Sequence, residues 1–331
     1  MRTSRSFSSS LAPSIRSYLS LKQALGRRFA GETDILAHLD QFLVSQAPLA
    51  TALTPESFGS WCLTFGHLTP TVRRKWMRIV RNLCLYLRRT DPHCFVPDPS
   101  GFPAPHVPRR PHIFSEEEIG RLLRSAADLH PRSTSPLCAE GFRLSVVLLY
   151  TAGLRRGELA RLVLSDYDQS EGTLLIRASK FHKSRMVALS RDAAREVEHY
   201  LHARRRLPHD ADSPLLIARF KGLRGRSGPG LGHSLRQLFR RAGVRTASGS
   251  LPRVHDLRHT HAVHVLLRWY RTGVDVQAKL PALAASMGHV SIASTAYYLA
   301  FLEPVAQAAS ERFARHCSHL LSPTSGRGGD R

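Results

Sequence analysis

The sequence predicts a mainly α-helical protein with a small β-sheet, an α+β fold arranged in two lobes. Apolar residues recur every three or four positions through most of the chain, which is the spacing of one helix face. Two short runs, residues 173–178 and 185–189, have the composition of β-strands. A stretch at 91–112 holds seven prolines and divides the lobes, because so many prolines permit neither a helix nor a central strand.

The composition limits the class of protein and of partner. The 331 residues, 42% hydrophobic and 22% charged, are enough for two globular domains. Lys and Arg number 48 against 25 Asp and Glu, for a formal net charge of +23. This excess favours a polyanionic partner, since basic charge binds phosphate backbones through counterion release. A basic ribosomal or membrane-surface protein would share the charge, so composition alone leaves those classes open.

Cysteine usage and the absence of long apolar runs predict a cytoplasmic protein. The five cysteines are scattered and form no C-x-x-C pair, so neither a disulfide framework nor a zinc knuckle is indicated. No apolar run approaches the roughly 20 residues of a membrane helix. The chain start lacks the apolar core of a secretory signal, and its Arg/Ser-rich composition resembles an organellar presequence. We expect residues 1–16 to be a flexible tail.

Residues 17–90 are predicted to form a small helical bundle. A Thr-Asp pair gives a start signal for a helix at 33–46. Thr54 followed by a proline forms the N-cap of a second helix, 54–66. A third helix, 70–90, is apolar on one side and basic on the others. A basic run is usually a solvated face, and contact with nucleic-acid phosphates is the competing interpretation, with candidate residues Arg73, Arg74 and Lys75.

The second lobe opens with an acidic helix start signal at 115–118. Residues 141–151 are apolar enough for a buried helix, which leads into the segment TAGLRRGELARL. Gly153 permits a break there, after which Arg155 begins a new helix that carries Glu158. Buried backbone on both sides of this turn would hold Arg155 rigidly.

The two strand-like runs, TLLIRA and RMVAL, are joined by SKFHKS, most simply as a β-hairpin with Lys180 and Lys183 near its tip. Lysines on exposed turns are commonly solvated, but one at a mobile tip can also reach a site. Helices are expected at 191–206 and 233–242. The glycine-rich basic loop between them, 221–232, lacks the P-loop pattern.

Residues 251–271, LPRVHDLRHTHAVHVLLRWYR, predict a half-buried helix with a polar stripe. His255 and Arg258 are three positions apart, so they project from one face and suit a phosphate oxygen. Two alternatives stay open here. Histidines on such a helix are commonly core or surface residues, and His255 with His259 has the i, i+4 spacing of a zinc site. Arg258 argues against zinc, because a guanidinium repels a dication.

Residues 278–302 predict two short helices, the first of which ends at a glycine followed by His289. The second helix carries Tyr297 and Tyr298. Adjacent helix residues point about 100° apart, so at most one of these tyrosines can face a common site. A further helix is expected beyond this segment, and the Gly/Ser/Arg-rich end, 321–331, has the composition of disorder.

Taken in order, these landmarks resemble the tyrosine recombinase (phage integrase) family. LYTAGLRRGEL is similar to the block with the family's first arginine, SKFHKSRMVAL to its β-hairpin with the catalytic lysine, VHDLRHTHAVHVLL to its His-x-x-Arg helix, and MGHVSIASTAYY to the segment that ends at its nucleophile. Tyr298 lies nine residues after His289, which is the family spacing. The motifs cover about 140–303, and 17–90 corresponds by position to the family's core-binding domain. Ala188 stands where the family often has proline.

The resemblance implies a domain organisation. A helical, SAM-like core-binding DNA domain is expected at 17–90, a proline-rich linker at 91–112 and the catalytic recombinase domain at 113–320, between the flexible tail at 1–16 and the disordered tail at 321–331. The two domains are expected to form a C-shaped clamp on double-stranded DNA, because a semi-stiff linker would let them hold opposite faces of a duplex.

The resemblance also implies transesterification of a DNA phosphodiester without metal or other cofactor. The two arginines would bind the nonbridging oxygens, the lysine would protonate the leaving 5′-oxygen, the first histidine would assist proton transfer at the tyrosine, and the second would hydrogen-bond the phosphate. Glu158 would orient its arginine neighbour. The catalytic residues so assigned are Arg155, Lys180, His255, Arg258, His289 and the nucleophile Tyr298.

The implied partners are double-stranded DNA, copies of the same chain in a homo-tetramer on synapsed sites, and other recombinases. The implied role is integration, excision or transposition of a mobile element, in a bacterial nucleoid. Two alternatives remain: a DNA-binding relative that has lost catalysis, and a type IB topoisomerase. Occupancy of all six catalytic positions argues against the first, and relaxation of supercoils without a specific site would identify the second.

Overall fold

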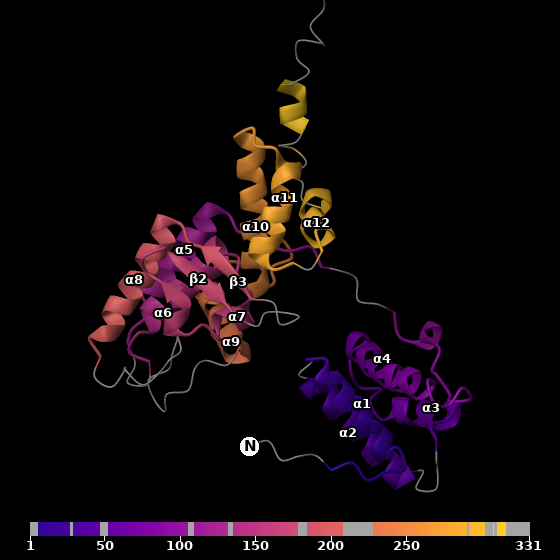
Figure 1. The fold of residues 1–331 in the computed structure, drawn as a ribbon. Coiled ribbons are helices and arrows are strands. Elements are labelled where there is room, and N and C mark those ends of the chain that lie inside the picture. The colour runs from indigo at the N-terminus through magenta and orange to yellow at the C-terminus, as the bar shows by residue number, and fades with distance from the viewer. Residues whose placement is uncertain are drawn as a thin grey trace, which may run out of the picture. The chain divides into compact units, whose positions relative to one another are not determined.

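The structure is a computed structural model that divides into two compact units, Met1–Arg109 and Arg110–Arg331 (Figure 1). The described residues are 6–26, 29–46, 52–104, 109–131, 135–177, 184–207, 228–289, 291–301, 307 and 310–315. Lys180, Lys183 and the predicted tail at 321–331 lie outside them.

The first unit is the predicted helical bundle. Its helices are α1 (Ala12–Ala24), α2 (Ala30–Gln46), α3 (Pro55–Leu63) and α4 (Pro70–Leu87). The start of α3 is as predicted, because the Thr54 hydroxyl accepts a hydrogen bond from the amide of Ser57 at 3.2 Å. Helix α2 begins earlier than predicted. Thr33 does not cap it, since its hydroxyl donates to the Phe29 carbonyl one turn back at 2.8 Å.

The core of this unit is built around a group of aromatic rings. Trp61 is fully buried, and its ring centroid lies 4.6 Å from that of Phe65 in an edge-on arrangement. The indole Nε1 donates to His38 Nδ1 at 3.0 Å. Burial lowers the pKa of His38, which keeps the ring neutral and able to accept this bond. The polar atom of the largest core side chain is thereby satisfied.

The expectation of a flexible tail at 1–16 is wrong for its second half. Helix α1 begins inside this range, and Ile15 is fully buried. The carboxylate of Asp40, on α2, accepts the backbone amides of Ser8 at 2.9 Å and Ser9 at 3.0 Å. The Arg/Ser-rich composition concealed an amphipathic helix whose first turn contains a proline.

The proline-rich stretch belongs in part to the same unit. Phe102 is buried in the core, and its neighbours form a short 3₁₀ turn, Pro99–Gly101. Arg74 donates to the Pro103 carbonyl at 2.7 Å, and Arg81 donates to the Pro97 carbonyl at 3.1 Å. Side chains of the basic helix α4 therefore help to fix this segment, together with the backbone hydrogen bond from Phe102 to the Pro99 carbonyl at 3.2 Å.

The second unit is mainly helical with one small sheet, which confirms the predicted fold class. Its three antiparallel strands have the order β1-β2-β3, and β2 pairs with β3 in the predicted hairpin, with Leu174 opposite Val187. The short β1 was not predicted. The elements are α5 (Glu116–Ala127), α6 (Cys138–Thr151), α7 (Arg156–Leu159), β1 (Tyr167–Asp168), β2 (Thr173–Ile176), β3 (Arg185–Ala188), α8 (Arg191–Arg205), α9 (Gly228–Arg241), α10 (Val254–Arg271), α11 (Val276–Met287) and α12 (Ala293–Phe301).

Helix α9 begins five residues before the predicted start, so the expected glycine-rich loop is wrong at 228–232. Glycine and proline are tolerated there because the first turn of a helix has no intrahelical partners for its amides. The rest of that loop, 221–227, lies outside the described residues. None of the described helices combines the length and the apolarity that a membrane crossing requires.

Helices α6 and α10 organise the second unit. Helix α6 contacts α5, α8 and α10, and its Leu144, Val146 and Leu148 are fully buried. On another side of α10, Val263 and Leu266 form a second apolar cluster with residues of α11, and Tyr298 of α12 belongs to it. Figure 1 shows α10, α11 and α12 packed side by side. This packing holds α10, which carries His255 and His259, against α12, which carries Tyr298.

We expect Asp40→Ala to destabilise the first unit by about 2 kcal/mol, because it leaves the amides of Ser8 and Ser9 without their charged acceptor. Urea unfolding of the full chain, followed by hydrogen exchange of peptides from α1 and α2, would report this unit alone. The neighbouring exposed change Gln41→Ala should stay within about 0.5 kcal/mol of the parent. Equal effects of the two changes would contradict the structural role of Asp40.

Candidate active site

Helix α10 presents the polar residues of the site, and its start is fixed by a capping box. The backbone amide of Arg253 donates to the Asp256 carboxylate at 2.9 Å, and Asp256 is buried. The next turn is anchored by Thr260, whose hydroxyl accepts the amide of Phe114 at 3.0 Å. Leu257 is fully buried in the core. The stripe that includes His255 and Arg258 is therefore held in one orientation.

Arg258 lies at the centre of the site with only 1% of its surface exposed. Its guanidinium donates to the carbonyl oxygens of Gly153 and Met287, which come from two different turns. Burial, and then the charge of Arg155, lower the pKa of Arg258 to about 10, so the group stays charged near neutral pH. Gly153 has φ +58°, and a Cβ there would lie 2.6 Å from the His261 ring. Only glycine fits this turn.

Arg155 approaches from the N-terminus of α7. Its Nη1 donates to Glu158 at 2.7 Å, and its Nη2 donates to the Gly288 carbonyl at 2.8 Å. Gly288 ends α11 in a left-handed conformation with φ +65°. The Arg155 side chain remains 25% exposed. Both arginines are thus aimed by backbone carbonyls at glycine turns, and Arg155 keeps an edge open to solvent.

A buried carboxylate joins this arrangement to the β-hairpin. Glu158 also accepts two hydrogen bonds from Arg185 of β3, at 3.1 and 2.9 Å, and Arg185 Nε donates to the Ser286 carbonyl at 2.7 Å. Burial alone would raise the pKa of Glu158, but the hydrogen bonds from Arg185 and from Arg155 outweigh it and lower the pKa to about 2. The sequence predicted that Glu158 orients Arg155, and in the structure Glu158 binds Arg185 as well.

Arg185 was not predicted as a site residue, although the sequence contained a signal for it. Side chains alternate along a strand, so Arg185 shares a face with Val187, two positions on. Val187 is buried in the hydrophobic core. An arginine on the buried face of a strand needs a buried acceptor, and Glu158 was the acidic residue already expected near the site.

His255 and His289 flank the arginines. Desolvation by the surrounding protein, and then the charge of Arg258, lower the pKa of each histidine to about 4, although His255 keeps an accessible edge. His289 Nδ1 lies 2.8 Å from the hydroxyl of buried Thr295. Both rings are therefore neutral near pH 7 and can accept as well as donate.

Tyr298 is 3% exposed, and its ring lies 6.4 Å from that of His289 in a stacked arrangement. Burial raises its pKa to about 12, against opposing effects of Arg258 and Arg155. Its hydroxyl is 2.9 Å from His259 Nδ1. Tyr297, its neighbour, is half-buried. His259 thus contacts the tyrosine hydroxyl, whereas the sequence had indicated it only as a possible zinc ligand.

The structure brings together five of the six predicted catalytic residues, Arg155, His255, Arg258, His289 and Tyr298, since the two arginines influence the pKa of each of the other three. The sixth, Lys180, lies outside the described residues. Among the described residues, no three His, Cys, Asp or Glu side chains are arranged to hold a metal ion. The three candidate DNA-binding residues lie on α4: Lys75 is exposed, Arg73 and Arg74 are half-buried, and Arg74 is bonded to Pro103.

Comparison with known proteins identifies the family. The model of the phage integrase family matches residues 113–303. A putative integrase/recombinase of Sinorhizobium fredii, y4rB, is 31% identical over 312 residues, which cover 93% of this chain and 98% of the relative. The chain belongs to the phage integrase family of tyrosine recombinases. Members of this family are site-specific recombinases, which cut and rejoin DNA strands.

Another sequence relative agrees with this membership, and two solved structures share the fold. The tyrosine recombinase XerA of Thermococcus kodakarensis is 31% identical over 196 residues, covering 59% of this chain and 60% of the relative. The Tn1549 transposon integrase, solved in complex with transposon right end DNA, has a TM-score of 0.61 at 15% identity, covering 91% of this chain and 99% of that chain. A lambda integrase dimer bound to a core site has a TM-score of 0.59 at 14% identity, covering 86% and 94%. These two structures establish a shared fold.

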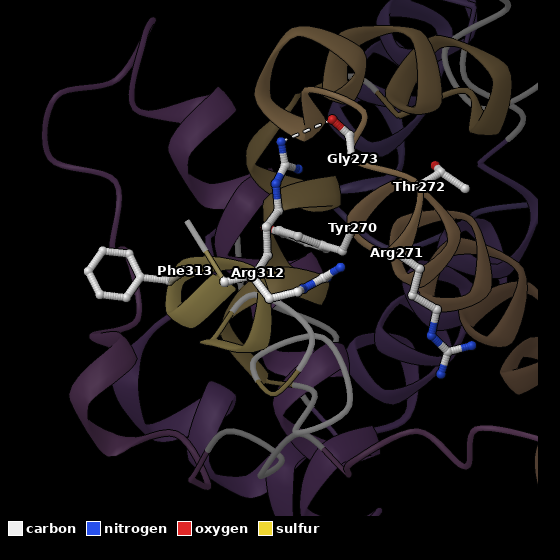
Figure 2. Close-up of a pocket in the computed structure, with 7 residues that line it drawn as sticks. Tyr270, Arg271, Thr272, Gly273, Arg312 and Phe313 are labelled. Atoms are coloured by element: carbon white, nitrogen blue, oxygen red, sulfur yellow. Dashed lines mark hydrogen bonds between the residues drawn. The ribbon is translucent and has the colours of Figure 1, made fainter. Parts of the chain in front are cut away.

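A pocket of about 790 Å³ lies at the C-terminal end of α10 (Figure 2). None of the described catalytic candidates is among its lining residues. Tyr270 and Phe313 contribute to its lining. Arg312 donates to the carbonyl oxygens of Val274 at 2.8 Å and Gly273 at 3.0 Å. These two hydrogen bonds attach residues 310–315 to the turn that follows α10.

We expect Glu158→Gln to lower the unfolding free energy of the recombinase by about 3 kcal/mol at pH 7, since it removes a buried partner of two arginines. The folded pKa of about 2 lies below the ordinary 4.5, so the stabilising effect is present above pH 4.5 and is lost as the pH falls towards 2. The difference from the parent should therefore shrink with falling pH in urea titrations. Exposed Glu171→Gln is the control. A difference independent of pH would contradict this account.

Proposed function

We propose that the chain is a site-specific recombinase in which Tyr298 attacks a DNA phosphodiester and forms a covalent 3′-phosphotyrosyl intermediate. The biological role that we propose is integration, excision or transposition of a mobile element. The names of the matching integrase/recombinase and transposon integrase support this role. Double-stranded DNA is the proposed substrate, bound by a tetramer of the chain on two synapsed sites.

The observation that carries the proposal is the meeting of two fixed guanidinium groups beside a buried tyrosine. Arg155 and Arg258 come from separate elements, and each is close enough to Tyr298 to affect the pKa of its hydroxyl. Four of the five N–H groups of a guanidinium point along its two edges in a planar fork, which suits the oxygens of a phosphate. In such a site, the charge that develops on the phosphoryl group is stabilised without a metal ion.

The chain's own residues account for each part of the reaction. The Tyr298 oxygen would form a bond to phosphorus while the bond from phosphorus to the 5′-oxygen breaks. The arginines would hold the nonbridging oxygens, and His289 would donate a hydrogen bond to one of them. His255 would assist proton transfer through its accessible edge. Lys180 is the proposed proton donor to the leaving 5′-oxygen.

We expect Tyr298→Phe to abolish covalent capture of DNA while leaving DNA affinity within about threefold, because only the attacking oxygen is removed. Nicked suicide duplexes that tile the DNA flanking the chain's gene would be incubated with protein and resolved on denaturing gels. Tyr297→Phe is the matched control and should retain the adduct. An adduct with Tyr298→Phe would refute the assignment, and DNA binding without any adduct in the parent would indicate a non-catalytic relative. Relaxation of supercoiled DNA lacking a site would indicate a topoisomerase.

We expect Arg258→Lys to lower the cleavage rate by about 10²- to 10³-fold, because one ammonium cannot bond both turn carbonyls and also face the phosphate. DNA affinity should change by less than about threefold, since the contact strengthens only as charge develops in the transition state. Single-turnover cleavage and equilibrium binding would be measured together. The same change at exposed Arg195 should leave both unaffected. A parallel loss of affinity and rate would mean that Arg258 serves ground-state binding.

A further inference from the structure

We propose that His259 is the proton acceptor for the nucleophile: its Nδ1 takes the phenolic proton as the Tyr298 oxygen attacks phosphorus. This inference rests on the proposed function, because it concerns the same reaction. It adds a catalytic residue to those expected from the sequence motifs. His259 lies one position after the arginine of the His-x-x-Arg motif, on the helix that carries both.

The geometry places His259 at the reacting atom. Its Nδ1 is 2.9 Å from the Tyr298 hydroxyl, and the two ring centroids are 5.5 Å apart. Within the part of the chain that the structure describes, no other residue hydrogen-bonds this hydroxyl. Tyr298 is 3% exposed, so bulk water has little access to take the proton. A general base must lie within hydrogen-bond reach of the proton that it removes, and His259 does.

The protonation states of His259 and Tyr298 determine which of the two donates this hydrogen bond. Burial, followed by the proximity of His255, lowers the pKa of His259 to about 4, so its ring is neutral near pH 7. Burial raises the pKa of Tyr298 to about 12, so its oxygen carries a proton. A neutral imidazole has one acceptor nitrogen. The tyrosine hydroxyl therefore donates to Nδ1, with the ring proton on Nε2.

The charges around His259 favour a temporary transfer. Its titratable neighbours are His255, Asp256 and Arg258 on α10, Arg253 at the N-cap of that helix, and Tyr298 on α12. The nearby cations disfavour a lasting imidazolium, while Asp256 partly offsets them. His259 would thus take the proton only during the attack and pass it on to solvent through its partly exposed ring, and the same ring would deliver a proton to the tyrosine oxygen when the 5′-hydroxyl attacks during rejoining.

The ring of His259 is also fixed in place. The His255 ring lies 4.8 Å away, edge to face at 85°. This contact and the bond to Tyr298 define the ring orientation from two sides. His255 keeps an accessible edge beside His259, so its proposed part in proton transfer is compatible with His259 as the first acceptor.

The test compares His259→Ala and His259→Asn with the parent in single-turnover cleavage of the duplex that captures the parent protein. The amide oxygen of asparagine can accept the tyrosine hydrogen bond near the Nδ1 position but cannot take the proton. We expect both variants to form the adduct at least about 100-fold more slowly, with DNA affinity within about twofold. Imidazole in the buffer should partly restore His259→Ala.

The chain offers a matched control in His264→Ala. His264 is on the same helix, and its Nδ1 lies 2.9 Å from the Tyr150 hydroxyl, so the control breaks the same kind of bond outside the site. It should retain the parent cleavage rate within about threefold. In His259→Ala, the rate should rise with pH, because hydroxide must replace the missing base, whereas the parent rate should be nearly flat from pH 6 to about 9.

A second measurement needs no DNA. In NMR spectra of protein whose tyrosines carry carbon-13 at the ring carbon that bears the oxygen, the Tyr298 resonance can be identified because it is missing in Tyr298→Phe. This resonance should shift in His259→Ala and stay in place in His264→Ala. An unshifted resonance, or parent-like cleavage by His259→Ala, would overturn the role of His259. Full activity of His259→Asn would reduce it to a positioning residue. In each of these cases Tyr298→Phe decides the proposed function separately.

Discussion

The buried guanidinium of Arg258 is the interaction on which the rest of the site depends. A charge this deep is tolerated because two backbone carbonyls, from Gly153 and Met287, accept its hydrogen bonds. The first carbonyl belongs to the turn before α7, and the second to the end of α11. One side chain therefore fixes the relative position of α7, α10 and α11, so the same contacts that satisfy the charge also assemble the site.

Electrostatic balance explains why so many cations can share this small volume. Arg155, Arg185 and Arg258 lie close to one another. Among the residues that the structure describes, Glu158 is the carboxylate beside them, and it contacts Arg155 and Arg185 directly. The site retains a net positive charge in the absence of DNA. A phosphate is the group that would compensate it, and after burial, which is the larger cause, the charge of Arg258 also lowers the pKa values of His255 and His289.

The sequence predicted the polar residues of the site better than their contacts. The spacing in the sequence placed His255 and Arg258 on one helix face, and Gly153 predicted a turn just before Arg155. The hydrogen bond between Tyr298 and His259 joins residues 39 positions apart and depends on how α12 packs against α10, which local patterns do not encode. The ordered start of α1 was missed for a related reason, because its anchor, Asp40, lies 31 residues from Ser9.

Tyr298 is under two opposing influences, and the binding of DNA would change their balance. Burial disfavours the tyrosinate, while Arg258 and Arg155 favour it, and burial prevails. A bound phosphate would compensate part of the positive charge and so weaken the arginines' support for a tyrosinate. Ionisation before attack would then be harder in the complex than in the free protein. Transfer of the proton during attack, to a base already bonded to the hydroxyl, avoids that separate step, and the neutral ring of His259 is suited to it.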